Sequence, residues 1–412
     1  MTINWGIERI GFYGGRSFID IADLATLRKL DPLRMANLLI SRKTVHFPWE
    51  DPVSFAVNAA RPLLQALEPG QRRNINHLLV ASESGLDFGK SLATWIHGHL
   101  DLPREIRLFE IKQACYGGTA ALQTAIGLLA RHGRPEAKAL VVCTDIARPI
   151  PHSYAEPTQG GAAIALLVGA DAEILEIEAG ASGLHGYHVM DAFRPDPDQE
   201  TGDADLSVLT YIDCLQKTFA SYCASAVGPV DFRDYFSYLA FHTPFGGMVK
   251  GAHRTLMRRL YQAASADIEA DFHRRLAPSL TYCREVGNIY SGTVFLALAG
   301  TIASAMPDRK SRIGLFSYGS GCSSEFYSGW ASPQAETALA LAGLPENLAG
   351  RQRLNMVDYE RVLAANRRSR FGEREARIDP VELHDLYESA FAGRGVCVLQ
   401  GIRHYEREYG DA

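Results

Sequence analysis

The 412-residue sequence lacks several features that mark other classes of protein. Its formal net charge is -5, without the excess of basic residues that a nucleic-acid-binding surface needs. No apolar run reaches membrane-spanning length, and the first residues have neither the basic segment nor the apolar run of a secretory signal. We therefore expect no nucleic-acid partner and no membrane association.

Paired cysteines and common cofactor motifs are also missing. The seven cysteines are scattered and include no CxxC pair, which argues against a disulfide framework or a zinc site and favours a reducing, cytoplasmic location. No GxGxxG follows a predicted strand, and there is no HExxH motif. We expect neither a metal nor a redox cofactor.

What the first 170 residues do contain is an alternation of apolar strands and helices. Periodicity predicts helices over 20–30, 33–40, 51–67 and 89–100, and strands over 4–14, 75–82, 139–145 and 162–168. This order is typical of an α/β fold, and the continuous apolar strands predict a mostly parallel sheet that is buried on both faces.

The second part of the chain resembles the first in its order of elements. It contains predicted strands over 238–241 and 312–318, a small-residue helix within 286–305, a solvated and partly helical stretch over 349–380, and a final edge strand over 395–404. We predict an internally duplicated fold whose halves are residues 1–170 and 171–412.

Cys115 lies between a predicted strand at 107–114, which we expect to run into the core, and a predicted buried helix at 119–129. Gly117 and Gly118 are expected to form a tight turn just after it. A thiol at a helix N-terminus faces unpaired N–H groups and the positive end of the helix dipole, both of which favour the thiolate. Cys115 is thus a candidate nucleophile; the alternative is an inert, buried cysteine.

Two further strand ends present residue types suited to acid–base chemistry. Glu83 follows the strand at 75–82, where open α/β sheets bind ligands, and burial would raise its pKa towards values that suit a general base. His242 follows the strand at 238–241. Taken singly, Glu83 could be an exposed residue beside a helix cap, and His242 a hydrogen-bonded core or surface residue.

Taken together, five motifs resemble the 3-hydroxy-3-methylglutaryl (HMG) synthase family in order and spacing. They are Ser82-Glu-Ser-Gly-Leu-Asp, Lys112-Gln-Ala-Cys-Tyr-Gly-Gly-Thr-Ala-Ala, Phe241-His-Thr-Pro-Phe, Gly287-Asn-Ile-Tyr-Ser and Phe316-Ser-Tyr-Gly-Ser-Gly. The resemblance covers nearly the whole chain. It implies a thiolase-like fold, in which duplicated α/β halves form a five-layered αβαβα core, and a homodimer. It also implies a catalytic triad of Cys115, Glu83 and His242.

The chemistry that this resemblance implies agrees with the residue types. Cys115 would attack an acetyl thioester and hold the acetyl group covalently. Glu83 would remove a proton from the acetyl methyl, and the resulting carbanion would attack the β-ketone of an acetoacetyl-type thioester. His242 would polarise or protonate the ketone oxygen. Water would then release the branched product from the cysteine.

The resemblance implies supporting roles for five more residues. Tyr116, Asp145 and Asp191 would line the acetyl-cysteine pocket, and Asn288 and Ser320 would hydrogen-bond the substrate carbonyl or the groups around it. For Asp145 and Asp191 an aspartate that caps a turn stays an equal alternative.

The residues of several motifs are more similar to those of one branch of the family. That branch acts on acyl groups of acyl carrier proteins (ACPs) in polyketide β-branching. A basic cluster would suit an acidic carrier protein, or its phosphopantetheine arm, at the mouth of the site. Its members lie on one predicted helix: Lys250, His253, Arg254, Arg258 and Arg259. Arg34 is a weaker candidate. An ordinary solvated helix face, or a site for the 3′-phosphate of coenzyme A, would use the same charges.

The sequence therefore predicts an HMG-synthase-like condensing enzyme that adds a cysteine-bound acetyl group to a β-ketoacyl-ACP, with donor and acceptor ACPs as partners. The first alternative is a coenzyme A-dependent HMG-CoA synthase of the mevalonate route. A thioester hydrolase or ketosynthase relative, and a catalytically inactive relative, are alternatives from other classes.

Overall fold

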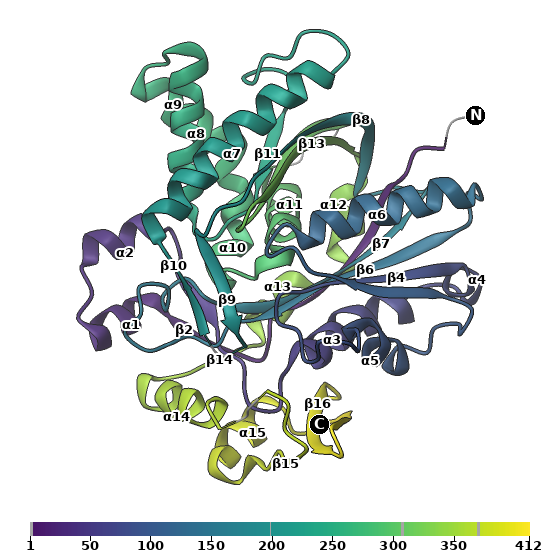
Figure 1. The fold of residues 1–412 in the computed structure, drawn as a ribbon, viewed down its shortest axis with the longest axis vertical. Helices are drawn as coiled ribbons and strands as arrows, with labels where there is room; N and C mark the ends of the chain where they lie inside the picture. The colour runs from purple at the N-terminus through teal and green to yellow at the C-terminus, as the bar shows by residue number, and fades with distance from the viewer. Residues whose placement is uncertain (1–2, 198, 306–308, 369–370) are drawn as a thin grey trace.

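The computed structural model describes residues 3–197, 199–305, 309–368 and 371–412 (Figure 1). Its central feature is a nine-stranded sheet with the strand order β11-β12-β13-β8-β1-β7-β6-β4-β5. The strands are β1 (Gly6–Tyr13), β4 (Ile75–Ala81), β5 (Arg107–Ile111), β6 (Lys138–Ile146), β7 (Gly161–Gly169), β8 (Leu175–Gly186), β11 (Tyr238–Phe241), β12 (Ser311–Gly319) and β13 (Ser323–Ala331). Five of them lie before residue 170 and four after it.

Helices cover this sheet in three layers. One layer contains α3 (Pro52–Gln65) and α5 (Leu92–His99). The second contains α6 (Gly117–His132) and α11 (Thr293–Ala305), and the third contains α7 (Ala204–Ser225) and α8 (Gly246–Tyr261). Successive side chains of a strand point to opposite faces. Leu140 of β6 accordingly packs with α3 and α5, whereas Val141 packs with α6 and α11. Leu315 of β12 faces α6 and α11, and Phe316 faces α7 and α8. The layers therefore follow the predicted αβαβα order.

The prediction of a mostly parallel sheet is wrong. Among the described strands of the nine-stranded sheet, only the pairs β4–β5, β4–β6 and β11–β12 are parallel, and the other neighbours are antiparallel. Every residue of β6 and β7 is buried, so both strands read as continuous apolar runs. Such runs indicate burial on both faces, but they contain no information on strand direction.

The early helices agree with their predicted positions. The predicted spans 20–30 and 33–40 contain α1 (Ile21–Arg28) and α2 (Pro32–Leu38), and α3 begins after Asp51, whose carboxylate accepts a hydrogen bond from the Ser54 N–H. The sequence patterns did not reveal α7, β8, β13 or the hairpin formed by β9 (Ala192–Asp196) and β10 (Gln199–Gly202).

The end of the chain also differs from its prediction. β16 (Cys397–Arg403) is the middle strand of a small sheet, between β15 (Glu375–Arg377) and β17 (Glu406–Asp411), rather than a final edge strand. His404 and Tyr405 form the β16–β17 turn with φ angles of 53° and 68°, values that glycine or asparagine usually supplies. The sequence therefore gives no turn signal there.

The predicted excursion at 349–380, part of which lies outside the described residues, contains α14 (Met356–Asn366). With α15 (His384–Ala390) and the small sheet, it packs beneath the first half of the fold (Figure 1). β14 (Gln352–Arg353) pairs with β2 (Ser17–Asp20), which also pairs with β3 (Arg42–Thr44). Within the described ranges, no helix combines the length and apolar character needed to cross a bilayer.

Candidate active site

Cys115 lies in the short connection between β5 and α6. Because β5 is the edge strand of the nine-stranded sheet and only half-buried, the prediction that it runs into the core is wrong. Gly117 and Gly118 are the first residues of α6 rather than a turn, and the backbone turns at Ala114, whose φ is 43°. The cysteine nevertheless lies just before a helix N-terminus, as predicted.

Two glycines let the cysteine loop contact the second half of the chain. A Cβ on Gly118 would lie 2.1 Å from the carbonyl oxygen of Ser291, and a Cβ on Gly319 would lie 2.6 Å from the carbonyl oxygen of Gln113 and the amide nitrogen of Tyr116. Any larger residue would push these segments apart. The loop that contains Cys115 is therefore fixed against the end of β12.

Glu83 follows β4 on the same side of the sheet. Gly117 packs against the end of β4, since a Cβ built on it would lie 3.7 Å from the Cβ of Ala81. Glu83 is two residues further on, and its side chain keeps 18% of its surface exposed. The sulfur of Cys115 and this carboxyl are close enough for the charge of Glu83 to act on the thiol.

Asp145, at the end of β6, fixes the segment around Glu83. It is fully buried, and one of its carboxylate oxygens accepts hydrogen bonds from the Glu83 N–H at 2.8 Å and from the hydroxyls of Ser82 and Ser84. Its other oxygen accepts hydrogen bonds from the N–H and the hydroxyl of Ser291. Both oxygens of Asp145 thus accept hydrogen bonds from protein donors in this structure.

His242 follows β11, and its N–H donates to the carbonyl oxygen of Phe316 on β12 at 2.7 Å. β11 and β12 are parallel, so their carboxyl ends lie at the same edge of the sheet. β12 continues three residues beyond Phe316 to Gly319, which contacts the cysteine loop. His242 therefore lies at the edge of the sheet where the end of β12 contacts the loop of Cys115.

The surroundings shift the pKa values of the carboxyl and the thiol upwards. Burial, with the negative charges of Asp145 and Glu200, raises the pKa of Glu83 to about 8, although Arg194 opposes this shift. Burial, followed by the charges of Glu83, Asp145 and Glu200, raises the pKa of the Cys115 thiol well above its ordinary value. Burial and the nearby carboxylates therefore oppose the predicted preference of Cys115 for the thiolate.

The imidazole shifts in the opposite direction. His242 is buried, its Nδ1 has no hydrogen-bond partner among the described residues, and burial lowers its pKa to about 3. Tyr211 donates a hydrogen bond to the carbonyl oxygen of His242 rather than to its ring. The imidazole is therefore neutral at physiological pH.

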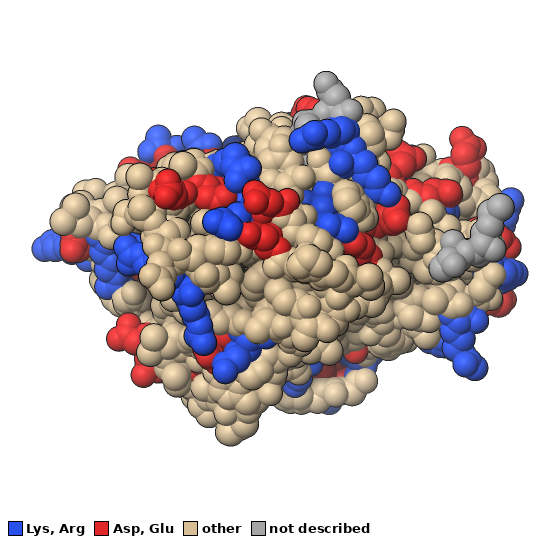
Figure 2. Space-filling view, turned by 90° about the horizontal axis from the view of Figure 1, so that it is seen from above, with Lys and Arg blue, Asp and Glu red and all other residues tan. Residues whose placement is uncertain are grey.

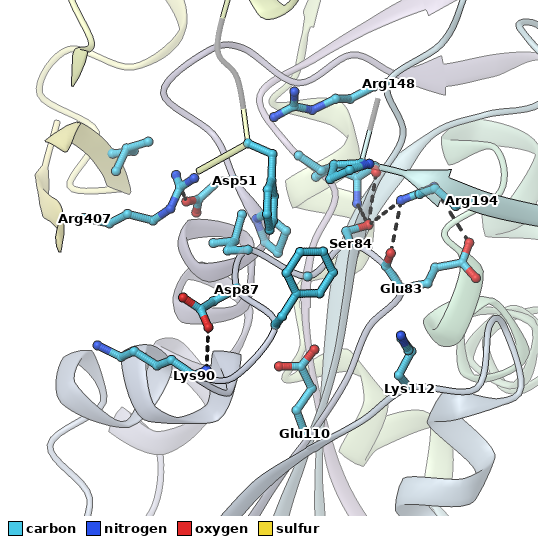
Figure 3. A pocket seen from close by; sticks show the side chains of 18 of the residues that line it. Asp51, Glu83, Ser84, Asp87, Lys90, Glu110, Lys112, Arg148, Arg194 and Arg407 are labelled. Atoms are coloured by element: carbon cyan, nitrogen blue, oxygen red, sulfur yellow. Dashed lines mark hydrogen bonds and ion pairs between the residues drawn. The ribbon is translucent and has the colours of Figure 1, made fainter. Parts of the chain in front are cut away.

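Sequence reasoning missed a cluster of polar residues around Glu83. Arg194 on β9 donates to the carbonyl oxygen of Glu83 at 3.2 Å, and its guanidinium lies 3.8 Å from the Glu83 carboxylate (Figure 3). Glu200 on β10 accepts hydrogen bonds from Arg194, Gln159 and Tyr290. Tyr290 lies inside the Gly287-Asn-Ile-Tyr-Ser motif of the family resemblance, which was the available signal for it.

The other residues predicted to support substrate have protein partners in this structure. The Asp191 carboxylate accepts from the hydroxyl of Tyr318 and from the N–H of Gly321 at 2.9 Å, so it holds the turn after β12. The Tyr116 hydroxyl donates to Glu325 at 2.7 Å. Asn288 Oδ1 accepts from the N–H of Tyr290, and half-buried Ser320 lies in the turn after β12.

The predicted basic cluster divides into exposed and buried members. Lys250 and Arg254 lie one turn apart on α8, and Lys250 pairs with Glu269 at 2.6 Å. His253 does not face solvent with them: it is fully buried and hydrogen-bonded to Asp271 at 2.8 Å, so the prediction of an exposed cluster fails at this residue. Arg34, on α2, stacks over the ring of Tyr154.

A cavity of about 500 Å³ opens beside Glu83 (Figure 3). Its described lining includes Glu83, Ser84 and Arg194 together with residues of the C-terminal region, but neither Cys115 nor His242. The described residues include no group of three or more histidine, cysteine, aspartate or glutamate side chains arranged to hold a metal ion. Of the three predicted catalytic residues, Glu83 is the one that lines this cavity.

A fold of this kind, with a cysteine, a glutamate and a histidine at adjoining strand ends, is that of the thiolase-like HMG synthases. Residues 3–173 match the family described as "Hydroxymethylglutaryl-coenzyme A synthase N terminal", and residues 252–391 match its C-terminal counterpart. The chain belongs to the hydroxymethylglutaryl-coenzyme A synthase family.

Individual relatives are similar over their full length. The chain is 45% identical to the Bacillus subtilis protein named "Polyketide biosynthesis 3-hydroxy-3-methylglutaryl-ACP synthase PksG", with 99% of each chain covered. It is 35% identical to the hydroxymethylglutaryl-CoA synthase of Enterococcus faecalis, over 88% of this chain and 92% of that one. The crystal structure of the HMG synthase of the curacin biosynthetic pathway, in complex with holo donor-ACP, has a TM-score of 0.96 at 47% identity, covering 99% of this chain and all of that one.

Proposed function

We propose that this protein is an ACP-dependent HMG synthase that builds β-branches during polyketide biosynthesis. The proposal is supported by the positions of three residues at element ends: Cys115 before α6, Glu83 after β4 and His242 after β11. The loop of Cys115 contacts the end of β12, the parallel neighbour of β11. The names of the B. subtilis and curacin relatives, one an HMG-ACP synthase and the other crystallised with a donor ACP, support the carrier.

In the first step, the sulfur of Cys115 attacks the carbonyl carbon of an acetyl thioester, and the carrier thiol leaves. Because the pKa of Cys115 is raised, the resting protein holds a thiol, and its proton is lost during acetyl transfer rather than before it. The product of this half-reaction is acetyl-Cys115.

In the second step, Glu83 removes a proton from the acetyl methyl group. The electron pair of that C–H bond forms a new C–C bond to the β-carbonyl carbon of the acceptor thioester, whose oxygen becomes an alkoxide. His242, neutral at physiological pH, stabilises that oxygen by donating a hydrogen bond from its ring, and the alkoxide then takes a proton from water. Hydrolysis then releases the product from Cys115.

The supporting residues act mainly by holding this geometry. Asp145 positions Glu83, and Asp191 and Tyr116 position the ends of β12 and α6. Asn288 and Ser320 remain candidates for contact with the substrate carbonyl.

We place the carrier over α8 and α2, two helices that contact each other. Lys250 and Arg254 on α8 and Arg34 on α2 supply positive charge for an acidic carrier protein or for its phosphopantetheine arm. Charges of both signs are interspersed on the face of the molecule seen in Figure 2, so the carrier would be recognised by a few positioned cations rather than by a large basic surface.

Two features of assembly complete the proposal. β5 is an edge strand of the sheet, and Phe88, which lines the cavity beside Glu83, is 93% exposed. We therefore expect a homodimer, in which a partner would cover such surfaces. We also expect residues 1–170 and 171–412 to be the two thiolase-like halves, and the protein to work in the cytoplasm without a metal or redox cofactor.

The decisive experiment compares two acetyl donors, acetyl-ACP and acetyl-CoA, with acetoacetyl-ACP as acceptor. Mass spectrometry of the enzyme should detect an acetyl adduct on Cys115, formed faster from acetyl-ACP, and an HMG-type product on the acceptor. Cys115→Ser should remove the adduct. Preferential loading from acetyl-CoA would contradict the carrier assignment, and no adduct from either donor would contradict the mechanism.

A further inference from the structure

Arg194 is a nearly buried cation with no role in the chemistry described so far. It lies on β9, in the short hairpin between β8 and α7, and its side chain is 16% exposed. Its guanidinium contacts Glu83 twice, at the carbonyl oxygen (3.2 Å) and at the carboxylate (3.8 Å), and it lies 3.5 Å from the hydroxyl of Ser84. It therefore touches both the backbone and the side chain of the proposed base.

A second carboxylate holds Arg194 in this position. Oε2 of Glu200, on the paired strand β10, accepts from Arg194 at 3.1 Å, from Gln159 Nε2 at 2.9 Å and from the Tyr290 hydroxyl at 2.9 Å. The guanidinium also lies 5.3 Å from the centre of the Tyr290 ring. Residues of the first half and of the second half thus fix the hairpin beside Glu83.

Arg194 lies at different distances from the carboxylates of Glu200 and Glu83, and this difference affects Glu83 as a base. Arg194 is closer to Glu200, at 3.1 Å, than to the Glu83 carboxylate, at 3.8 Å. Arg194 therefore makes its shorter ion pair with Glu200, and its contact with the Glu83 carboxylate is too long to be a tight ion pair. A base in a tight, short ion pair would hold its charge too firmly to accept a carbon-bound proton.

We propose that Arg194 and Glu200 are a pair of positioning residues that set the orientation and the proton affinity of Glu83, acting with opposite sign. This assignment rests on the proposed function, because it requires Glu83 to be the base that deprotonates acetyl-Cys115.

Several other charged groups face Glu83 and are part of its environment. Asp145 of β6 contacts it through the backbone, and Cys115 interacts with it from the β5–α6 connection. The same cavity is lined by Glu110 of β5, by Lys112 and by Arg148. Among the groups that act on its pKa, Arg194 lowers it, whereas burial, Asp145 and Glu200 raise it. Removing Arg194 or Glu200 should therefore shift the titration of Glu83 in opposite directions.

The test measures the exchange of the acetyl methyl protons with deuterium on acetyl-Cys115, as a function of pH, by mass spectrometry of the loaded full-length enzyme. Glu83 must be ionised to act, so the wild-type rate should rise with pH towards a plateau. In Arg194→Gln this rise should move to higher pH by about one unit or more. In Glu200→Gln it should move to lower pH, because Arg194 stays held by Glu83 and Ser84.

Arg194→Lys should restore most of the wild-type pH dependence, because it keeps the charge, with a lower plateau because it lacks the planar fork. Lys90→Gln is the matched control: it removes a positive charge that lines the same cavity away from Glu83, and its pH profile should equal that of the wild type. Thermal melting of each variant identifies any that fail to fold.

If Arg194→Gln and Glu200→Gln load acetyl groups, melt normally and keep the wild-type pH profile, the assignment is overturned. If both variants lose rate equally at every pH, the pair has only a structural role, which also overturns it. Failure of the proposed function has a different signature, since the wild-type enzyme itself would then form no acetyl-Cys115.

Discussion

Two regions of the site surround their titratable groups in contrasting ways. The carboxylate region, formed by Glu83, Asp145, Arg194 and Glu200, is dense in charges and hydrogen bonds. The imidazole region, formed by His242 and Tyr211, is nearly free of charge, and Nδ1 of His242 has no partner in the described chain. The first raises the pKa of Glu83 to about 8, and the second lowers that of His242 to about 3.

This contrast assigns different roles to the two groups. A carboxyl whose pKa lies close to the working pH can accept a carbon-bound proton and return it to solvent. An imidazole that stays neutral can donate a hydrogen bond to a developing alkoxide without first having to lose a positive charge. Charged neighbours tune the first group, whereas burial alone tunes the second.

The comparison is tested most severely by replacing the base. Glu83→Gln keeps the shape of the side chain and removes its proton affinity, so condensation should fall by about 10³-fold or more, while acetyl loading of Cys115 continues. Product formation and the acetyl adduct should be measured on the same sample. Condensation within tenfold of the wild type would show that another group removes the proton.

Replacing the imidazole should have the next largest effect. His242→Ala removes the group that stabilises the ketone oxygen, and the rate of condensation should fall by about 10²-fold. In the wild type, His242 should produce no inflection between pH 5 and 9, since its pKa lies far below that range. A His242-dependent inflection near neutral pH would show that its surroundings are more polar than the structure indicates.

A smaller effect is expected outside both regions, where the carrier is proposed to bind. Arg254→Glu reverses an exposed charge on α8 and should raise the KM for acetyl-ACP several-fold, with kcat nearly unchanged. Reversal of Arg309, an exposed residue just before β12, is the matched control and should leave KM unchanged. Equal effects of both variants on KM would show that the carrier does not bind at this face.

The smallest effect concerns stability rather than rate. Glu83 has a pKa of about 8 in the folded protein against an ordinary value of 4.5, so the folded state binds the proton more tightly than the unfolded state does. This group therefore costs increasing stability as pH rises from about 4.5 to 8, and the cost is constant above that range. Glu83→Gln should therefore have a higher free energy of unfolding than the wild type at pH 8 and nearly the same free energy of unfolding at pH 4. A constant difference at all pH values would contradict the raised pKa.

The sequence motifs, through the family resemblance, were sufficient to predict the αβαβα fold, and they marked three candidate catalytic residues that stay predictions. Cys115, Glu83 and His242 each follow or precede a well-marked apolar strand, and their motifs are contiguous in sequence. Strand direction could not be predicted, because fully buried strands such as β6 and β7 have the same composition in either direction.

The neighbours of the triad were harder to predict, for a related reason. Arg194 contacts Glu83 across a sequence separation of 111 residues, on a hairpin that has no strong strand pattern. His253 has the spacing of an exposed basic residue, yet it is buried and hydrogen-bonded to the buried Asp271. A polar residue's partner determines its position, and a single sequence does not identify partners that lie far away in the chain.

The central claim, that Glu83 removes a proton from an acetyl group held on Cys115, is tested most directly by deuterium exchange into that acetyl group without any acceptor present. The wild-type acetyl-enzyme should exchange its methyl protons with solvent deuterium at a rate that rises with pH through about 8. The Glu83→Gln acetyl-enzyme should accumulate without exchange. Exchange at the wild-type rate in Glu83→Gln would contradict the account.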